Sequence, residues 1–247
     1  AAAPAAHIPL RFANYISQPI AYEYTLINFC CHKDSRLHNP KFHKGVCRVV
    51  MITIEIDARS HKAMELIRLV CHQSNGRVVL WSGLPCAGGC PWQYMNGKTP
   101  EGKARIEEHT KLMVELLECF VRAGKYVLKQ GGIICFEWPR QRAYWKRKDI
   151  IDMQTVLKLN PTTFCGCAVG LKSCTPGKEH LFIKKPWRVC CSHDCIDKIF
   201  SKFQCPGVSR IHEHDQCRGT NAKNSERYTD VFAVSAHRAF RSAFENM

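Results

Sequence analysis

The chain has 247 residues, of which 45% are hydrophobic, so it is long and apolar enough to form one large domain with a buried core. Lysine and arginine number 36 against 21 aspartate and glutamate, and the resulting formal charge of +15 favours polyanionic partners, nucleic acid above all. Since no apolar run approaches the roughly 20 residues that span a bilayer, we expect no membrane partner.

The predicted elements follow from alternating hydrophobic patterns. Residues 1–23 are expected to form an N-terminal arm, because they show no clear periodicity. Short, continuous apolar runs typical of buried strands then alternate with amphipathic helical stretches. The predicted strands are 24–29, 47–56, 77–81, 133–138, 162–168 and 187–191, and the predicted helices are 60–74, 101–130, 144–159, 194–203 and 229–244. Residues 30–45 are expected to form a loop.

This alternation predicts an α/β fold, namely a doubly wound, mostly parallel sheet with helices on both faces. We expect the α/β domain to span residues 24–203. Residues 204–247 are predicted to add a small Cys/His-rich element and a C-terminal helix.

Sixteen cysteines are many for this length, and several, such as Cys71, Cys119 and Cys135, lie inside apolar runs. A free thiol in such a run behaves as a small hydrophobic side chain. We therefore expect an intracellular, reducing compartment, whether nucleus, cytoplasm or an organelle, rather than the disulfide framework of a secreted protein. The Ala-rich start has neither the basic end nor the apolar centre of a signal peptide.

Two consecutive predicted strands are followed by residues that carry chemistry. Pro85-Cys86 follows strand 77–81, and strand 133–138 runs into Glu137-Trp138-Pro139. In a parallel sheet these two strand ends lie side by side, which would bring Cys86 and Glu137 together. Such strand ends are where a buried parallel sheet presents reactive and acidic side chains. The alternative is that residues 85–89 form a tight structural turn.

A Pro-Cys at one strand end and a Glu-x-Pro at the next resemble the two catalytic motifs of cytosine-C5 DNA methyltransferases. The resemblance implies a Rossmann-like methyltransferase fold that uses S-adenosylmethionine. It also implies that the Cys86 thiolate attacks C6 of a flipped base while Glu137 contacts N3 of its ring.

The same resemblance implies a cofactor site at the ends of the first two strands. The implied residues are Phe29, Cys31 and Ser35 after the first strand, and Glu55 and Asp57 after the second, where an acidic side chain takes the ribose hydroxyls. The turn from Phe29 to Ser35 has no glycine, in contrast to that family. Capping of the following helix is the alternative role for Asp57.

A second resemblance covers most of residues 25–232. The pattern Leu-Trp-x-x-x-Pro-Cys-x-Gly-Gly-x-Pro-Trp-Gln, with Glu-Trp-Pro, Gly-Leu-Lys and Lys-Lys-Pro-Trp after it, is similar to uncharacterised protist open reading frames that are often retroelement-like. That group implies the same fold and supplies no established activity.

A candidate metal site follows from residues of the Cys/His-rich element. Cys205, His212, His214 and Cys217 lie within 13 residues and are ligands that can close a tetrahedral zinc site. A small element with little core can take folding free energy from metal binding. A His-rich polar loop is the alternative. A weaker metal candidate combines Cys165, Cys167, Cys174, Cys190, Cys191 and Cys195, because Cys167 and Cys190 also fit apolar strands as core residues.

Cations are concentrated in the segments 140–148, 172–188 and 218–227. The predicted nucleic-acid-binding residues are Arg140, Arg142, Lys146, Arg147, Lys148, Lys184, Lys185 and Arg188. The cations would hold phosphates, and the interleaved Trp138, Tyr144 and Trp145 would stack on bases. The alternatives are a solvated helix face with Trp145 in the core and a generally basic surface.

The resemblance, together with the basic charge, implies a nucleic-acid-directed, methyltransferase-like protein, with DNA and RNA both open as partners. Two other hypotheses remain. One is a non-catalytic nucleic-acid-binding protein that keeps the fold without the cofactor turn. The other is a structural subunit of a larger ribonucleoprotein or viral-type assembly.

Overall fold

The centre of the molecule is a six-stranded sheet with the strand order β2-β1-β3-β4-β7-β5. The computed structural model describes residues 22–53 and 55–245, so most of the predicted N-terminal arm lies outside the described residues. The strands are β1 (Tyr24–Phe29), β2 (Cys47–Ile52), β3 (Val78–Ser82), β4 (Ile133–Pro139), β5 (Asn160–Cys165) and β7 (Pro186–Cys191).

The expected mixed α/β fold with a mostly parallel sheet is confirmed. β2, β1, β3 and β4 run parallel to one another, and β7 is antiparallel to both of its neighbours, β4 and β5. β5 therefore points the same way as the first four strands. Because β1 is flanked by β2 on one side and by β3 on the other, the strand order changes direction between β1 and β3.

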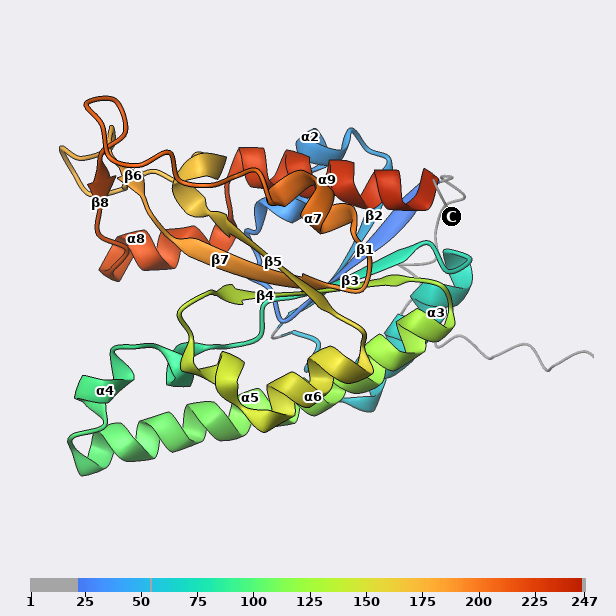
Figure 1. Cartoon of the computed structure of the whole chain (residues 1–247). Helices are drawn as coiled ribbons and strands as arrows, with labels where there is room; N and C mark the ends of the chain where they lie inside the picture. Colours follow the sequence, from blue (N-terminus) through green and yellow to red (C-terminus); the bar gives the residue numbers. More distant parts are fainter. Residues whose placement is uncertain (1–21, 54, 246–247) are drawn as a thin grey trace, which may run out of the picture.

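Helices cover both faces of this sheet (Figure 1). One face carries α3 (His61–Gln73), α5 (Pro100–Lys129) and α6 (Lys148–Val156), and the other carries α2 (Pro40–His43), α7 (Cys195–Phe200) and α9 (Asp230–Glu245). The alternating side chains of the strands feed two hydrophobic clusters, one on each face. In β1, for example, Ile27 and Phe29 point into the cluster under α5, whereas Tyr24 and Leu26 point into the cluster under α9.

Local signals explain where the two longest helices of the first face begin and end. The Ser60 hydroxyl caps α3 by accepting a hydrogen bond from the Ala63 N–H. Thr99 caps α5 in the same way, and Pro100 occupies the first helical position, where no N–H is needed. After α5 the backbone turns at Gly131, whose φ of +85° favours glycine.

The helix α9 packs on the sheet although it lies far from it in the sequence. Its Phe232 and Phe240 pack edge-on against Trp81 of β3. Its His237 forms a 2.7 Å hydrogen bond through Nδ1 with the hydroxyl of Tyr24 on β1. α9, which was expected to belong to a small C-terminal element, is thus part of the central hydrophobic core.

Small elements lie at the end of the molecule where the parallel strands finish (Figure 1). β6 (Phe182–Ile183) and β8 (His214–Asp215) form a separate two-stranded parallel sheet. Near it lies α8 (Gly219–Asn224), whereas α4 (Gln93–Asn96) projects from the opposite side of the main sheet. The short 3-10 helices are η2 (Arg36–His38), η3 (Ala87–Gly89), η4 (Ala143–Lys146), η5 (Gly166–Val169) and η6 (Ser225–Arg227).

Four predicted elements differ clearly from the structure. The expected strand 162–168 is β5 at Asn160–Cys165, and the residues after it form the 3-10 helix η5. The expected loop 30–45 contains η2 and α2, whose single turns are too short to show helical periodicity. β2 ends at Ile52, well before residue 56, although the sequence stays β-branched beyond it. The expected helix 144–159 divides into η4 and α6, because Arg147 has an extended backbone between them. Within the described part of the chain, no helix combines the length and apolarity that crossing a bilayer requires.

Candidate functional site

Cys86 and Glu137 lie at the same edge of the sheet. β3 and β4 are hydrogen-bonded parallel neighbours, with Ser82 opposite Phe136. Glu137 follows Phe136 on β4, and Cys86 lies four residues after Ser82, where the 3-10 helix η3 begins. The carboxyl ends of these two strands therefore place both side chains in one region, as expected for an α/β sheet.

The Cys86 thiol is surrounded by charged groups. The guanidinium of Arg142 lies beside the thiols of both Cys86 and Cys90. Burial raises the pKa of the Cys86 thiol, Arg142 and Lys185 act to lower that pKa, and Glu137 acts to raise it. The two cations thus offset part of the effect of desolvation, and the pKa of the Cys86 thiol remains above its usual value.

Two glycines hold the Pro-Cys loop against η4. A Cβ atom added to Gly89 would lie 2.6 Å from Cγ of Tyr144, and one on Gly88 would collide with the Tyr144 hydroxyl. Tyr144 is buried, and its hydroxyl forms a 2.9 Å hydrogen bond with Thr110 of α5. Because η4 begins directly after Arg142, this packing fixes the loop of Cys86 and the cation beside it together. The structural role of residues 85–89 and their candidate chemistry are therefore compatible.

Glu137 is a buried carboxyl group with one free oxygen. Glu137 is only 7% exposed. Burial raises the pKa of its carboxyl group, whereas Lys185, Tyr228 and Arg142 act to lower that pKa. The Tyr228 hydroxyl donates a 2.9 Å hydrogen bond to Oε2. Oε1 is buried without a hydrogen-bond partner among the described residues. A buried polar atom left without a partner is costly, so Oε1 has one hydrogen bond still to make.

The residues predicted after the first strand have varied surroundings. Phe29 is a core residue that packs on Phe120, with ring centroids 5.7 Å apart. The Cys31 thiol lies 3.5 Å from Nε2 of His38. Ser35 is buried, and its hydroxyl accepts a hydrogen bond from the Leu37 N–H at the start of η2.

The two acidic residues predicted after the second strand are both exposed. Asp57 forms an ion pair with Arg59, at 3.0 Å, and Arg59 also reaches Glu115 on α5 at 2.8 Å. The hydrogen bonds and charge of Arg59 hold the pKa of Asp57 below its usual range. Because α3 is capped by Ser60, the alternative that Asp57 caps this helix is wrong.

The edge between β1 and β3 has two further polar features. Cys30, directly after β1, has φ +55°, a conformation that glycine adopts more readily than other residues. Burial raises the pKa of the Cys30 thiol, and the neighbouring Cys31 and then Asp57 raise it further. Asn28 Oδ1 and Ser82 Oγ are buried without hydrogen-bond partners among the described residues. Unsatisfied polar atoms thus occur on both strands that flank the change in strand order.

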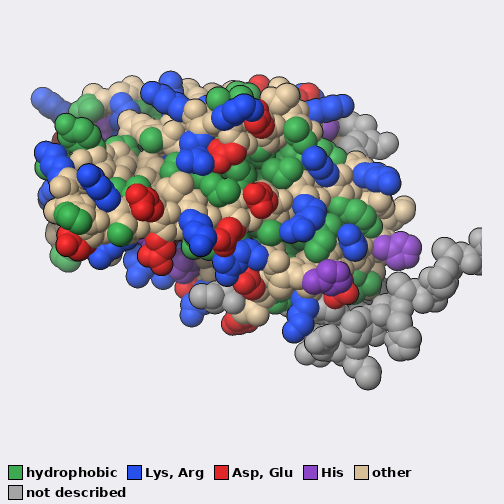
Figure 2. All heavy atoms as spheres, turned by 90° about the horizontal axis from the view of Figure 1, so that it is seen from below, with side chains coloured by type: hydrophobic (Ala, Val, Ile, Leu, Met, Phe, Trp, Pro, Cys, Tyr) green, Lys and Arg blue, Asp and Glu red, His purple; other side chains and the backbone are tan. Residues whose placement is uncertain are grey.

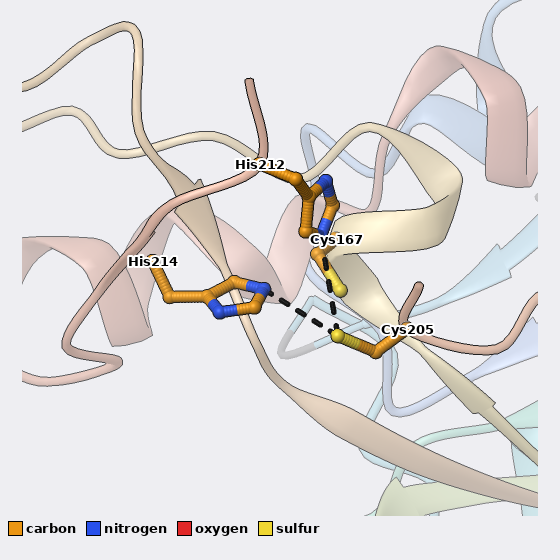
Figure 3. Close-up of side chains that lie close together, drawn as sticks. All are labelled: Cys167, Cys205, His212 and His214. Carbon is orange, nitrogen blue, oxygen red and sulfur yellow. Dashed lines mark hydrogen bonds between the residues drawn. The ribbon is translucent and has the colours of Figure 1, made fainter. Parts of the chain in front are cut away.

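Four side chains from separate segments form a candidate metal centre (Figure 3). Cys167 comes from η5, Cys205 from the segment after α7, His212 from a turn and His214 from β8. Their ligand atoms all lie within 4.8 Å of one another. The Cys205 sulfur is 3.6 Å from Nε2 of His214 and 4.0 Å from Nε2 of His212. This group can hold a metal ion.

The group matches the sequence-predicted metal ligands in three of four positions. Cys217 is not a member, because it packs partly against the core cluster beneath α9 and lies near Ser225 and Lys185. Its place is taken by Cys167, which was expected either in the weaker metal candidate or in the core of an apolar strand. Of the six cysteines of that weaker candidate, only Cys167 belongs to this group. β5 ends at Cys165, so Cys167 lies on the following 3-10 helix. Since Cys167 is 38 residues from Cys205, local ligand spacing carries no signal for this pairing.

The predicted nucleic-acid-binding cations fall into three groups. Arg140, Lys146 and Lys184 are exposed. Arg147 and Lys148 are ion-paired with Asp149 and Asp152, at 2.7 and 2.6 Å. Three others turn toward the protein: Arg142 lies beside Cys86, Lys185 donates to Ser225 Oγ at 2.7 Å, and Arg188 stacks 4.6 Å from the ring centre of Trp145.

The aromatic residues of the same segment lie in the core. Trp138, Tyr144 and Trp145 are all buried in the cluster under α5 and α6, as the alternative interpretation expects for Trp145. On the face seen in Figure 2, Lys and Arg side chains lie among Asp and Glu and form no patch of one sign. The inward-facing Arg142 and Lys185 are therefore the cations most directly tied to the Cys86 and Glu137 site.

No protein-family model matches the chain, and neither the curated proteins nor the solved structures contain a match to it.

Proposed function

We propose that this protein is a nucleic-acid-directed, methyltransferase-like protein whose Cys86 and Glu137 bind one base at the carboxyl edge of the sheet. One observation carries the proposal: a cysteine flanked by two cations and a buried carboxyl group with a free oxygen converge from neighbouring strands. The net charge of +15 supports a nucleic acid as the partner.

The arrangement supports a defined division of labour for a cytosine. Arg142 and Lys185 stabilise the Cys86 thiolate, whose sulfur forms a bond to C6 as the C5=C6 electron pair moves toward C5. The Glu137 proton bonds to N3 and withdraws electrons from the ring. S-adenosylmethionine, when bound, supplies the methyl group for C5. A solvent water then takes the proton from C5, the C5–H electron pair re-forms the C5=C6 bond, and the sulfur leaves C6 as the thiolate. N3 returns its proton to Glu137.

The surroundings of β1 fit such a cofactor in a Rossmann-like arrangement. Ligands of open α/β sheets bind outside the carboxyl ends of the strands where the strand order changes direction, here between β1 and β3. Cys30, in the left-handed conformation, would provide the tight turn that a glycine provides in Rossmann-like cofactor sites. Asn28 Oδ1, which has no hydrogen-bond partner among the described residues, could accept a hydrogen bond from the cofactor. Asp57 would hold the ribose hydroxyls after exchanging its contacts with Arg59.

A covalent trap tests this function. Oligonucleotides that carry 5-fluorocytosine, as DNA and as RNA, are incubated with the protein and S-adenosylmethionine, because fluorine at C5 cannot leave as a proton and the adduct persists. We expect a denaturation-resistant adduct with the wild type and with Cys90→Ser, which is matched to Cys86 by its contact with Arg142. Cys86→Ser should form none. Absence of an adduct from the wild type with both polymers would overturn the proposal.

The arrangement of Asp57 favours a second candidate, a non-catalytic nucleic-acid-binding protein or structural subunit of a larger assembly. The exposed Asp57 carboxylate is already held by Arg59, which Glu115 fixes from the other side. Calorimetric titration with S-adenosylmethionine separates the two candidates. Tight oligonucleotide binding without any cofactor binding supports the second, whereas cofactor binding that Asp57→Ala weakens supports the first.

We further propose that zinc is the metal held by Cys167, Cys205, His212 and His214. Two thiolates and two imidazoles are a donor set that zinc favours, and a closed set of four protein ligands is typical of structural sites. Tetrahedral zinc places its ligand atoms about 3.4 to 3.8 Å apart. The observed separations within 4.8 Å need only a small contraction to reach that geometry. The ring of His212 is already held by stacking on Phe182.

A further inference from the structure

Tyr228 has an unusual backbone conformation for a buried aromatic residue. Its φ of +63° and ψ of −173° lie in a region that residues other than glycine rarely adopt. Its ring stacks on Phe232 with centroids 4.4 Å apart and meets Trp81 edge-on. Strained residues of this kind persist where the surroundings hold them, and they cluster at functional sites.

The hydroxyl of Tyr228 connects two groups whose hydrogen-bonding roles are fixed by chemistry. Trp81 Nε1 lies 3.1 Å from the Tyr228 oxygen, and an indole N–H can only donate. The Tyr228 oxygen therefore accepts from Trp81, and its single proton is given to Oε2 of Glu137, 2.9 Å away. Oε2 is consequently an acceptor in this chain of hydrogen bonds, so a proton on the Glu137 carboxyl group resides on Oε1.

The free oxygen Oε1 is the atom that a ligand would meet. Tyr228 lies in the segment before α9, 91 residues after Glu137 in the sequence. The other charged groups that act on Glu137 are Lys185, before β7, Arg142, after β4, and Glu226, on η6. Lys185 is itself held by Ser225 Oγ. Oε1 has no partner among the described residues.

We propose that Tyr228 is a positioning residue that orients the Glu137 carboxyl group and confines its proton to Oε1. Glu137 then offers one hydrogen-bond donor to a bound base, and the base that fits has a ring nitrogen with a lone pair, as N3 of cytosine has. A uracil or thymine presents N3–H at the same place, so two donors would face each other and the base would be rejected. The identity of the ligand rests on the proposed function, whereas the role of Tyr228 at Glu137 does not.

The decisive measurement is the titration of the Glu137 carboxyl carbon by NMR in the free protein. Tyr228→Phe keeps the stacked ring and removes the donor to Oε2. Because that hydrogen bond favours the charged carboxylate, the pKa of Glu137 should rise in this variant. Trp81→Phe frees the Tyr228 hydroxyl to rotate, and a smaller rise of the same sign is expected. An unchanged titration in both variants would overturn the inference.

A binding measurement tests whether Tyr228 contributes to the discrimination between cytosine and uracil. Oligonucleotides that differ only by one target cytosine or uracil are compared, and Tyr228→Phe should reduce their affinity ratio at least tenfold. Binding of an oligonucleotide without either target should be unchanged. If no variant forms the covalent adduct, the proposed function fails while the titration still reports on Tyr228. If the adduct forms but neither the titration nor the ratio changes, Tyr228 is only a packing residue.

Discussion

At the scale of single residues, the candidate site depends on how closely the Pro-Cys loop lies against the Tyr144 ring. Gly89 makes that approach possible, because its missing Cβ would otherwise fall 2.6 Å from the ring. The ring cannot retreat easily, since it is buried and tied to Thr110. The position of Cys86 is thus set by a glycine three residues away as much as by its own contacts.

Gly89→Ala should therefore push the loop away from Tyr144. We expect a loss of about 1–3 kcal/mol in the free energy of unfolding, as is typical of overpacking. We also expect slower alkylation of Cys86 or a changed pH dependence of it, because Arg142 no longer lies beside the thiol. Gly83→Ala is the matched control for stability, since a Cβ there meets its nearest atom, the Tyr228 hydroxyl, at 3.5 Å, an ordinary contact. Equal stability of the two variants in urea unfolding would contradict this account.

At the scale of elements, the candidate metal centre joins segments that have little core of their own. β6 and β8 are two residues each, and Ile211 nearby is 90% exposed. Cys167 lies on η5, which is anchored by the buried Val169 and Leu171. A metal bound there would fasten residues 205–214 to the main sheet.

We predict that Cys167→Ser loses the bound metal, whereas Cys217→Ser retains it. The first variant removes one of four ligands, and the second removes a thiol that lies outside the group. Zinc content by mass spectrometry and hydrogen exchange of residues 205–218 are the measurements. Chelation of the wild type should increase exchange in this segment far more than in β1 or β3, because metal binding supplies its local folding free energy. Equal zinc content in both variants would rule out the proposed ligand set.

Elements with strong periodicity could be predicted from the sequence, and those without it could not. β1 has the predicted bounds, because all six of its residues are buried and form one continuous apolar run. α3 and α5 were predicted to within a residue, because Ser60 and Thr99 cap them and glycines follow them. α2, β6 and β8 are too short to show a period.

For the candidate site, the sequence predicted neighbours along adjacent strands but not contacts made across the fold. Cys86 and Glu137 were expected together because consecutive parallel strands pair. Tyr228 reaches Glu137, and Cys167 reaches Cys205, only because later segments fold back onto the sheet. Contacts between residues so far apart in the sequence produce no local spacing pattern from which they could be predicted.

At the scale of the whole molecule, a buried histidine links three distant segments. His237 of α9 has Nδ1 2.7 Å from the Tyr24 hydroxyl of β1 and Nε2 3.0 Å from the Leu37 carbonyl oxygen of η2. The carbonyl can only accept, so Nε2 carries the proton and Nδ1 accepts from Tyr24. Burial, with a smaller effect from His43, lowers the pKa of His237 to about 4. The neutral ring therefore holds α9 on the sheet.

This linkage predicts that mild acid destabilises the fold. The pKa of His237 is lower in the folded protein than the 6.5 of a free histidine, so its stabilisation is complete above pH 6.5 and is lost as the pH falls toward 4. The loss should approach about 3 kcal/mol in the free energy of unfolding. Urea unfolding between pH 7 and pH 4.5 measures this loss. His237→Gln should flatten the pH dependence of the free energy of unfolding, because glutamine makes similar hydrogen bonds without titrating.

The control His61→Gln alters a side chain that is 79% exposed and should leave the slope of that pH dependence unchanged. Groups that do not act on His237, including Glu137 with its raised pKa, contribute equally to wild type and variants and cancel in the difference, whereas His43 and His38, which act on His237, remain part of it. An identical slope for wild type and His237→Gln would show that α9 stays on the sheet independently of the charge of this histidine.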